Sequence, residues 1–168
     1  MKLLVIRHGP AGDPDAWKAE GRADALRPLT PDGKNDMRQA AAGLATLVRN
    51  IDVLVSSPLV RAVQTAEIVA DEYDCKVVNS DTLEPERDPE EILKWLREQG
   101  LTGTVGLVGH EPHLSSLVGY LLAGKRISFI DLKKGGACLL GVTSPSPVGG
   151  TLEWLLTRRE LGRLGEIR

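Results

Sequence analysis

The sequence predicts an α/β protein in which helices cover both faces of a mostly parallel central sheet, a three-layer α/β/α arrangement with an antiparallel hairpin at one edge. Short apolar segments rich in Val, Leu and Ile lack polar alternation, which is typical of strands buried on both faces. They alternate with longer segments whose apolar residues recur every three or four positions, as on the buried face of a helix. This alternation favours a parallel sheet, and the length of 168 residues suits a single domain over residues 1–168.

The expected parallel strands are the four apolar segments at residues 2–6, 51–55, 75–78 and 104–108. Two further apolar segments, residues 137–142 and 151–157, flank a connection rich in Ser, Pro and Gly. Such a connection between two short strands predicts a hairpin. We therefore expect the last two strands to pair antiparallel at an edge of the sheet.

Capping signals mark where the helices begin. Three predicted helices share a capping residue followed directly by proline at the first helical position, namely Thr30, Ser57 and Asp88. Glu91 completes a capping box for the third of these, and Gly100 ends it. A fourth helix is expected from Pro112 to Gly124. Each helix follows an expected strand, as an α/β protein requires.

Two segments lie outside this regular alternation. Residues 9–27 are polar and Gly-rich, and loops of this length are usually functional or mobile. We expect Lys18, Arg22 and Arg27 to line the mouth of a site there, the alternative being a surface excursion with a helical turn at residues 16–20. In the basic tail, residues 158–168, interleaved leucines predict a solvated or packing helix with a frayed end.

The composition narrows the function classes. There are 21 Lys and Arg against 23 Asp and Glu, a net charge of −2, and only six aromatic residues, which disfavours nucleic acid as a partner. No apolar run approaches the roughly 20 residues that span a membrane, so we expect no membrane partner either. Cys75 and Cys138 form neither a disulfide framework nor a paired-thiol metal site. A cytoplasmic location fits this cysteine usage best.

Basic side chains follow three of the expected strands, at the edge of the sheet where parallel α/β proteins bind ligands. Arg7 and His8 follow the first strand, Arg61 lies just after the second, and His110 follows the strand at residues 104–108. A guanidinium group can bind two phosphate oxygens at once, in a bidentate manner. The backbone amides at the helix start after Ser57 add further donors for an anion. The sequence therefore predicts a phosphate-binding site.

The same residues suggest the chemistry. A neutral imidazole can act as a nucleophile near neutral pH, and neighbouring guanidinium groups lower its pKa, so His8 is the candidate nucleophile. Arg7 and Arg61 would hold the phosphoryl oxygens, and His110 would donate a hydrogen bond to them in the transition state.

Three motifs in this order resemble the histidine phosphatase superfamily, the phosphoglycerate mutase-like proteins. They are Arg7-His8-Gly9, the segment from Ser56 to Ala66, and Val108-Gly109-His110-Glu111-Pro112. The short chain and Arg27-Pro28-Leu29-Thr30 are similar to its SixA-type branch of protein phosphohistidine phosphatases.

The resemblance implies roles for individual residues. His8 would become phosphohistidine, while Arg7, Gly9, Arg61 and His110 would bind the phosphoryl group. No metal or other cofactor would be required, and the partner would be a phosphorylated protein carrying phosphohistidine, or a small phosphorylated substrate.

The general acid is the least defined part of this prediction. Glu84 follows a strand and is the candidate acid/base, Glu86 is the second choice, and Asp88 is better explained as a helix cap. A phosphoramidate substrate reduces the need for an acid, because a protonated imidazole leaves as a neutral group.

Two other functions stay open. One is a metal-dependent phosphohydrolase using His8, His110, His113 and Asp13, although Pro112 disfavours a helical pair of histidine ligands. The other is a non-catalytic module that binds phosphorylated partners. Loss of activity with a chelator would indicate the first, and phosphate binding without turnover would indicate the second.

Overall fold

Six strands form one sheet in the order β3-β2-β4-β1-β5-β6, in a computed structural model that describes residues 1–167. The strands are β1 (Lys2–Arg7), β2 (Val53–Ser56), β3 (Val77–Asn79), β4 (Thr104–Gly109), β5 (Ala137–Val142) and β6 (Gly150–Leu156). Strands β1, β4, β2 and β3 pair in parallel, whereas β5 pairs antiparallel with both β1 and β6. The predicted parallel sheet with an antiparallel edge hairpin is confirmed.

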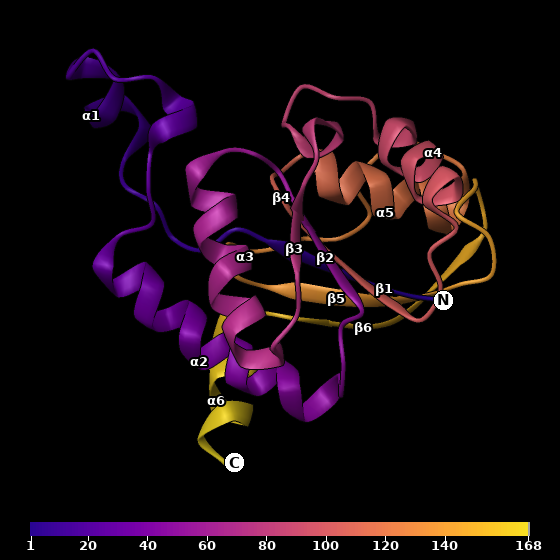
Figure 1. Cartoon of the computed structure of the whole chain (residues 1–168). Helices are drawn as coiled ribbons and strands as arrows, with labels where there is room; N and C mark the ends of the chain where they lie inside the picture. Colours follow the sequence, from indigo (N-terminus) through magenta and orange to yellow (C-terminus); the bar gives the residue numbers. More distant parts are fainter. Residues whose placement is uncertain (168) are drawn as a thin grey trace.

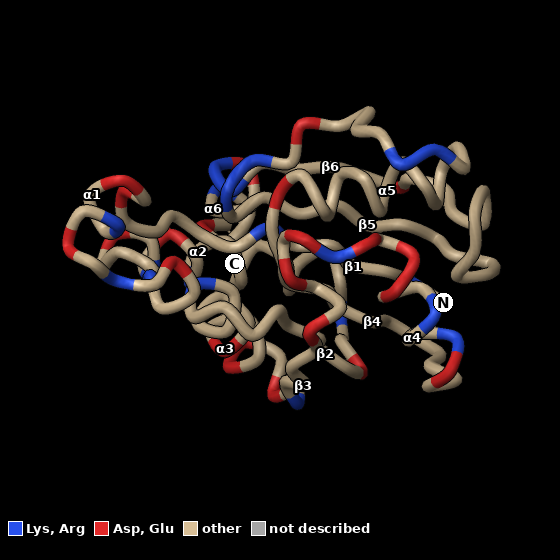
Figure 2. Tube along the Cα trace, turned by 90° about the horizontal axis from the view of Figure 1, so that it is seen from above, with Lys and Arg blue, Asp and Glu red and all other residues tan. Residues whose placement is uncertain are grey.

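Helices cover both faces of this sheet (Figure 1). On one face lie α2 (Pro31–Leu47), α3 (Val60–Tyr73) and α6 (Arg158–Glu166), and on the other α4 (Pro89–Gln99) and α5 (His113–Ala123). Successive β1 residues alternate between the two layers, because Leu4 and Ile6 pack with the first group and Leu3 and Val5 with the second. The charged residues lie mainly on the helices and loops around the sheet (Figure 2). Among residues 1–167, no helix is long and apolar enough to cross a membrane.

Most of the predicted helix signals act as expected. The Thr30 hydroxyl accepts a hydrogen bond from the amide of Gly33 at 2.9 Å. Asp88 and Glu91 form a capping box at the start of α4, and Gly100 ends that helix in the left-handed conformation with φ of 59°. A cap satisfies backbone amides that have no partner within the helix, which is why these residues fix the helix starts.

The predicted cap at Ser57 is wrong. Helix α3 begins at Val60 with Leu59 as its N-cap, and that cap has no side-chain hydrogen bond. The Ser57 hydroxyl accepts from the Leu59 amide at 3.4 Å and lies closer, at 2.8 Å, to Nε2 of His110. Local sequence rules assign the Ser57 side chain to the helix start, but its shorter contact is with His110, 53 positions away along the chain.

Residues 9–27 leave the body of the protein and return. They contain α1 (Pro14–Ala19) and the short 3-10 helix η1 (Asp24–Leu26), and Figure 1 shows α1 standing away from the sheet. We call residues 13–23 the arm. Its contacts are largely internal: the Trp17 indole donates to the Ala23 carbonyl at 2.9 Å, and the Arg22 guanidinium lies 4.6 Å from the Trp17 ring centre.

The basic tail forms helix α6, which packs against α2. Thr157 and Glu160 form a capping box, and Leu161 is fully buried. A Cβ atom at Gly43 would lie 1.8 Å from the Leu161 carbonyl oxygen, so the two helices touch there through backbone atoms. The expectation of a packing helix holds, because Arg158–Glu166 is helical and its Leu161 is buried. Arg168 lies outside the described residues.

Candidate active site

The two candidate histidines follow neighbouring parallel strands. His8 comes directly after β1 and His110 directly after β4, and the His8 amide donates to the Gly109 carbonyl at 3.0 Å. Their ring centres are 5.1 Å apart, and the side chains are almost fully buried, with 5% and 2% of each residue exposed. The structure thus brings together two of the predicted site residues that are 102 positions apart in the chain.

Arg61 lies in the first turn of α3, beside this pair. Its backbone carbonyl accepts from the Thr65 hydroxyl at 2.8 Å, and that hydroxyl accepts from the Gly9 amide at 3.0 Å. The backbone after β1 is therefore tied to the helix that carries Arg61. The buried Nε atom of Arg61 has no hydrogen-bond partner among the described residues, so it is a donor without an acceptor.

Arg7 closes the site on the side of β5. Its Nη1 donates to the Leu132 carbonyl at 3.0 Å, while its buried Nε has no partner within residues 1–167. The positive charge of Arg7 also acts on His8, whose pKa it lowers. Two guanidinium groups with unpartnered buried Nε atoms thus flank the histidines.

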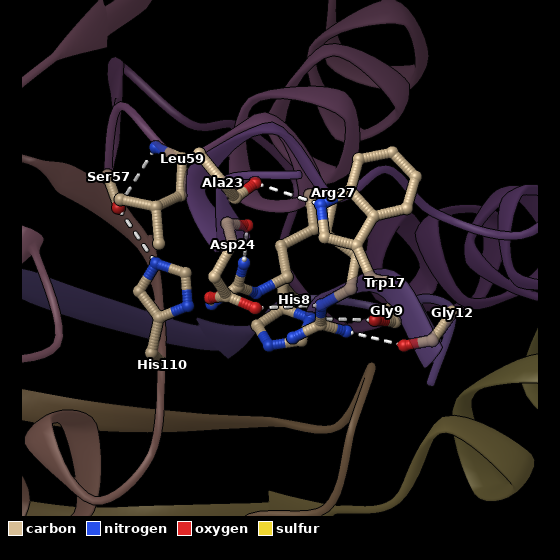
Figure 3. A network of polar contacts seen from close by, with 11 residues as sticks. His8, Gly9, Gly12, Trp17, Ala23, Asp24, Arg27, Ser57, Leu59 and His110 are labelled. Carbon is tan, nitrogen blue, oxygen red and sulfur yellow. Dashed lines mark hydrogen bonds and ion pairs between the residues drawn. The ribbon is translucent and has the colours of Figure 1, made fainter. Parts of the chain in front are cut away.

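Asp24, which the sequence analysis missed, is bound to Arg61. One carboxylate oxygen lies 3.0 Å from Nη2 of Arg61, and the Asp24 carbonyl accepts from Nη1 of Arg61 at 3.0 Å. The other carboxylate oxygen accepts from Nε of Arg27 at 3.0 Å. Asp24 therefore bridges two guanidinium groups at the site (Figure 3).

Arg27 lies deeper than the expected position at the mouth. It is buried, and its Nη1 donates to the Gly12 carbonyl at 2.7 Å (Figure 3). Burial raises the pKa of Asp24, but hydrogen bonding to Arg27 and the charges of Arg61 and Arg27 outweigh it and hold that pKa below its usual range. The only sequence signal for the Asp24–Arg27 pair was the segment Arg27-Pro28-Leu29-Thr30. Lys18 and Arg22 lie on the exposed arm.

The hydrogen bond of His8 defines its tautomer. Its Nδ1 lies 2.7 Å from the Gly9 carbonyl oxygen, and because a carbonyl only accepts, Nδ1 carries the proton of the neutral ring. Burial is the largest cause that lowers the pKa of His8 to about 3. The bond to Gly9 opposes burial, and the nearby guanidinium groups act with it, Arg61 first. Nε2 of His8 therefore holds a free lone pair.

His110 is also neutral near neutral pH. Burial, followed by the charges of His8 and Arg61, lowers the pKa of His110 to about 3. Its Nε2 is bonded to the Ser57 hydroxyl, and its buried Nδ1 has no partner among the described residues. In Figure 3 this second nitrogen lies on the side of the ring that faces His8 and Asp24. When Ser57 donates to Nε2, Nδ1 carries a proton that a phosphoryl oxygen can accept.

The remaining predicted residues are less closely tied to the histidines. The Gly9 amide already donates to the Thr65 hydroxyl. A Cβ atom at position 9 would lie 2.5 Å from Cγ of Met37, so packing alone explains why this position is glycine. Glu84 caps the 3-10 helix η2 (Asp81–Leu83), and Glu86 is exposed. Within residues 1–167, no hydrogen bond or ion pair joins either carboxylate to His8, so their acid/base role stays a prediction.

The four residues of the alternative metal site do not all come together, although His8 and His110 lie close to each other. Asp13 caps α1, accepting from the Ala16 amide at 2.8 Å. His113 is buried at the start of α5, behind His110. The part of the chain that the structure describes contains no group of three or more His, Cys, Asp or Glu side chains arranged to hold a metal ion.

Comparison with known proteins agrees with this geometry. The profile of the histidine phosphatase superfamily (branch 1) matches residues 3–88, a segment that contains Arg7, His8 and Arg61. The chain belongs to this superfamily. Membership supports phosphatase activity with a histidine nucleophile.

Within the superfamily, the chain is similar to SixA proteins along almost its whole length. It is 26% identical to phosphohistidine phosphatase SixA of Escherichia coli K12 over 165 residues, which is 94% of each chain. It is 33% identical over 147 residues to an uncharacterised protein of Picosynechococcus, covering 86% of each chain.

Solved structures show the same fold. The structure of the protein histidine phosphatase SixA complexed with tungstate has a TM-score of 0.80 and 25% identity, covering 96% of this chain and 99% of that one. A phosphoserine phosphatase from Entamoeba histolytica, 17% identical and covering 95% of this chain and 98% of that one, shares the fold with a TM-score of 0.70.

Proposed function

We propose that this protein hydrolyses phosphohistidine on a partner protein, through a covalent phosphohistidine intermediate on His8. The observation that carries the proposal is the state of His8: a buried, neutral imidazole with its proton on Nδ1 and a free Nε2, surrounded by guanidinium groups. A neutral ring is required for attack, and positive charge is required to hold the phosphoryl group.

In the first step, Nε2 of His8 attacks the phosphorus atom and forms a P–N bond while the bond to the leaving group breaks. Arg61 and Arg7 neutralise charge on the equatorial phosphoryl oxygens, and Nδ1 of His110 donates to one of them. The leaving imidazole takes the electron pair of the broken P–N bond. When its other nitrogen is protonated, it leaves neutral.

In the second step, water attacks the phosphorus atom bound to His8. The P–N bond breaks, and its electron pair returns to Nε2 of His8. The acid/base residue accepts the proton that water loses and passes it on to the departing phosphate or to solvent. Glu84 is the proposed acid/base residue, with Glu86 as the second choice. Asp24 is a poor proton donor in the free enzyme, because its pKa is held low.

The choice of substrate class rests on the weakly defined general acid, since no carboxyl group in the described part of the chain is clearly placed to protonate a leaving group. An alkyl ester needs a proton on its leaving alkoxide, whereas a protonated phosphoramidate does not. The similarity to SixA supports the same choice. We also propose that the protein works in the cytoplasm without a metal or other cofactor, and that it binds neither nucleic acid nor membranes. The free thiols of Cys75 and Cys138 are compatible with a reducing compartment.

Trapping the intermediate tests this function. We expect wild-type protein, quenched after mixing with a labelled phosphohistidine peptide, to carry acid-labile phosphate, and His8→Gln to carry none while keeping a cooperative unfolding transition. A peptide carrying phosphohistidine should give a higher kcat/KM than an aryl or a sugar phosphate.

Other outcomes would point to a different function. Turnover by His8→Gln would contradict the nucleophile. Chelator-sensitive turnover would indicate a metal-dependent phosphohydrolase, and tight phosphate binding without turnover would indicate a binding module.

A further inference from the structure

A second group of cations lies beside the phosphoryl site. It surrounds a surface cavity of about 410 Å³, which we call the basic pocket, lined by Arg7, Lys133, Lys134, Thr157, Arg158 and Arg159. In Figure 2 the Lys and Arg positions of the segment before β5 lie next to those at the start of α6. Five of the six lining residues are cationic and none is acidic.

The wall of the basic pocket is attached to the catalytic strand. The Gly135 amide lies within hydrogen-bond distance of the Arg7 carbonyl (3.1 Å) and the His8 carbonyl (3.0 Å), and the Arg7 amide donates to the Gly136 carbonyl at 3.1 Å. Gly135 has a positive φ of 72°, and a Cβ atom there would lie 2.9 Å from Cδ of Arg158. The loop carrying Lys133 and Lys134 is therefore held between the catalytic histidine and α6.

The positive charge of the basic pocket is only partly neutralised. Lys133 pairs with Asp131, and Arg158 lies 3.4 Å from a carboxylate oxygen of Asp36. Among residues 1–167, no acidic side chain comes within ion-pair distance of Lys134 or Arg159.

The helix α6 adds to the excess of positive charge. Its first two residues are Arg158 and Arg159. Cations at a helix N-terminus repel the helix dipole, which an acidic side chain would complement. Glu160 offsets part of this charge, but its carboxylate is bonded to Thr157 in the capping box. The arrangement leaves two cations available to an external anion.

We propose that the basic pocket binds acidic side chains adjacent to phosphohistidine on the substrate protein. Arg7 lines the basic pocket and also flanks His8, so an anion there would sit next to the phosphoryl group on the same substrate. Long, exposed Lys and Arg side chains adapt to carboxylates on a protein surface and attract them from a distance. This inference rests on the proposed function, because it assigns the surroundings of the same phosphoryl site.

Paired peptides test the inference. Two phosphohistidine peptides of equal length would differ only in flanking residues, Asp and Glu in one and Gln and Ser in the other. We expect wild-type kcat/KM to favour the acidic peptide about fivefold at low salt, the size that two exposed ion pairs supply. The preference should shrink when ionic strength screens the charges.

The double variant Lys134→Ala/Arg159→Ala should bring the ratio of the two kcat/KM values close to one. The control, Lys125→Ala/Arg163→Ala, makes the same change in net charge outside the basic pocket, and Arg163 lies on the same helix as Arg159. It should keep the preference. An equal loss in the control would overturn the inference in favour of a general electrostatic effect.

Binding to His8→Gln separates this inference from the proposed function. We expect a lower Kd for the acidic peptide than for the neutral one, whether or not the wild type hydrolyses them. Wild-type protein that hydrolyses neither peptide overturns the proposed function, while the Kd ratio still decides the inference. Equal Kd values for the two peptides overturn the inference alone. So does tighter binding of a small bisphosphate than of the acidic peptide.

Discussion

The carboxylate of Asp24 pairs with the guanidinium group of Arg61, which is the group proposed to bind a phosphoryl oxygen. It pairs with Arg61 at 3.0 Å and with Arg27 at 3.0 Å, although 55% of its side chain is exposed. A phosphate anion carries more charge than a carboxylate and can accept from both guanidinium groups. The proposed phosphoryl-binding role of Arg61 therefore implies that substrate and Asp24 compete for its guanidinium group.

Replacing Asp24 removes this competition. We expect Asp24→Asn to lower the inhibition constant of inorganic phosphate about threefold to tenfold, because the neutral amide pairs more weakly with Arg61 and Arg27. Steady-state inhibition with an aryl phosphate substrate would measure it.

The matched control is Asp15→Asn, which removes the same charge from the exposed arm. It should leave the inhibition constant unchanged. Weaker phosphate binding by Asp24→Asn would mean that the carboxylate mainly orients Arg61.

The buried histidines make stability depend on pH. His8 and His110 have pKa values of about 3 in the folded protein against 6.5 in a free side chain. Between these values the unfolded chain binds protons that the folded chain excludes, so the free energy of unfolding falls as the pH falls from 6.5 towards 3. Each histidine contributes about 1.4 kcal/mol per pH unit in this window, and nothing above it.

Urea unfolding across this pH window measures the effect. We expect His8→Gln to gain stability relative to wild type as the pH falls, because Gln does not titrate. A stability difference between the two proteins that is independent of pH would contradict a depressed pKa for His8.

At the scale of elements, strands and helix starts were predictable because their signals are local. The capping box at Asp88 and the ends of α4 and α5 follow from residues within one helical turn. The convergence of His8, Arg61 and His110 also followed, since parallel strands end at one edge of the sheet.

What could not be predicted depends on long-range contacts. The pairing of Asp24 with Arg61 joins residues 37 positions apart, and no periodicity or spacing marks it. The diversion of the Ser57 hydroxyl to His110 has the same origin.

The contact between α2 and α6 gives a test of element packing. We expect Gly43→Ala to lower the free energy of unfolding by about 1–3 kcal/mol, because its Cβ would meet the Leu161 backbone and the helices would have to separate. Urea denaturation would measure the loss.

Gly162→Ala is the matched control in the partner helix. A Cβ atom there would lie 3.8 Å from the nearest atoms, of Gln39, which is an ordinary contact. This variant should be neutral or gain up to about 1 kcal/mol through helix propensity. Equal losses for both variants would mean that the interface adapts freely.

For the whole molecule, the net charge of −2 conceals an uneven distribution. The charges of Arg7, Arg27 and Arg61 all act on His8, and Asp24 neutralises them only in part, so an anion bound there should stabilise the folded state. Ligands that bind only the folded state add about 2.7 kcal/mol at 100 times their Kd.

Tungstate should therefore raise the melting temperature of the wild type by several degrees, about 2–4 °C per kcal/mol at this chain size. Arg61→Ala should abolish most of this increase, whereas Arg49→Ala, at an exposed position just after the end of α2, should keep it. Equal increases in all three proteins would place the anion elsewhere. Differential scanning fluorimetry at several tungstate concentrations would measure the shifts.

The arm has a consequence for how such a protein can change over evolutionary time. Helix α1 has no buried residue, and the Trp17 and Arg22 contacts stay within the arm. Substitutions or insertions there leave the hydrophobic layers intact, so selection can vary the arm without unfolding the chain. Because the arm leads directly into Asp24 and Arg27, such variation would reach the phosphoryl site. New substrate preferences could then arise while His8 and His110 keep their positions.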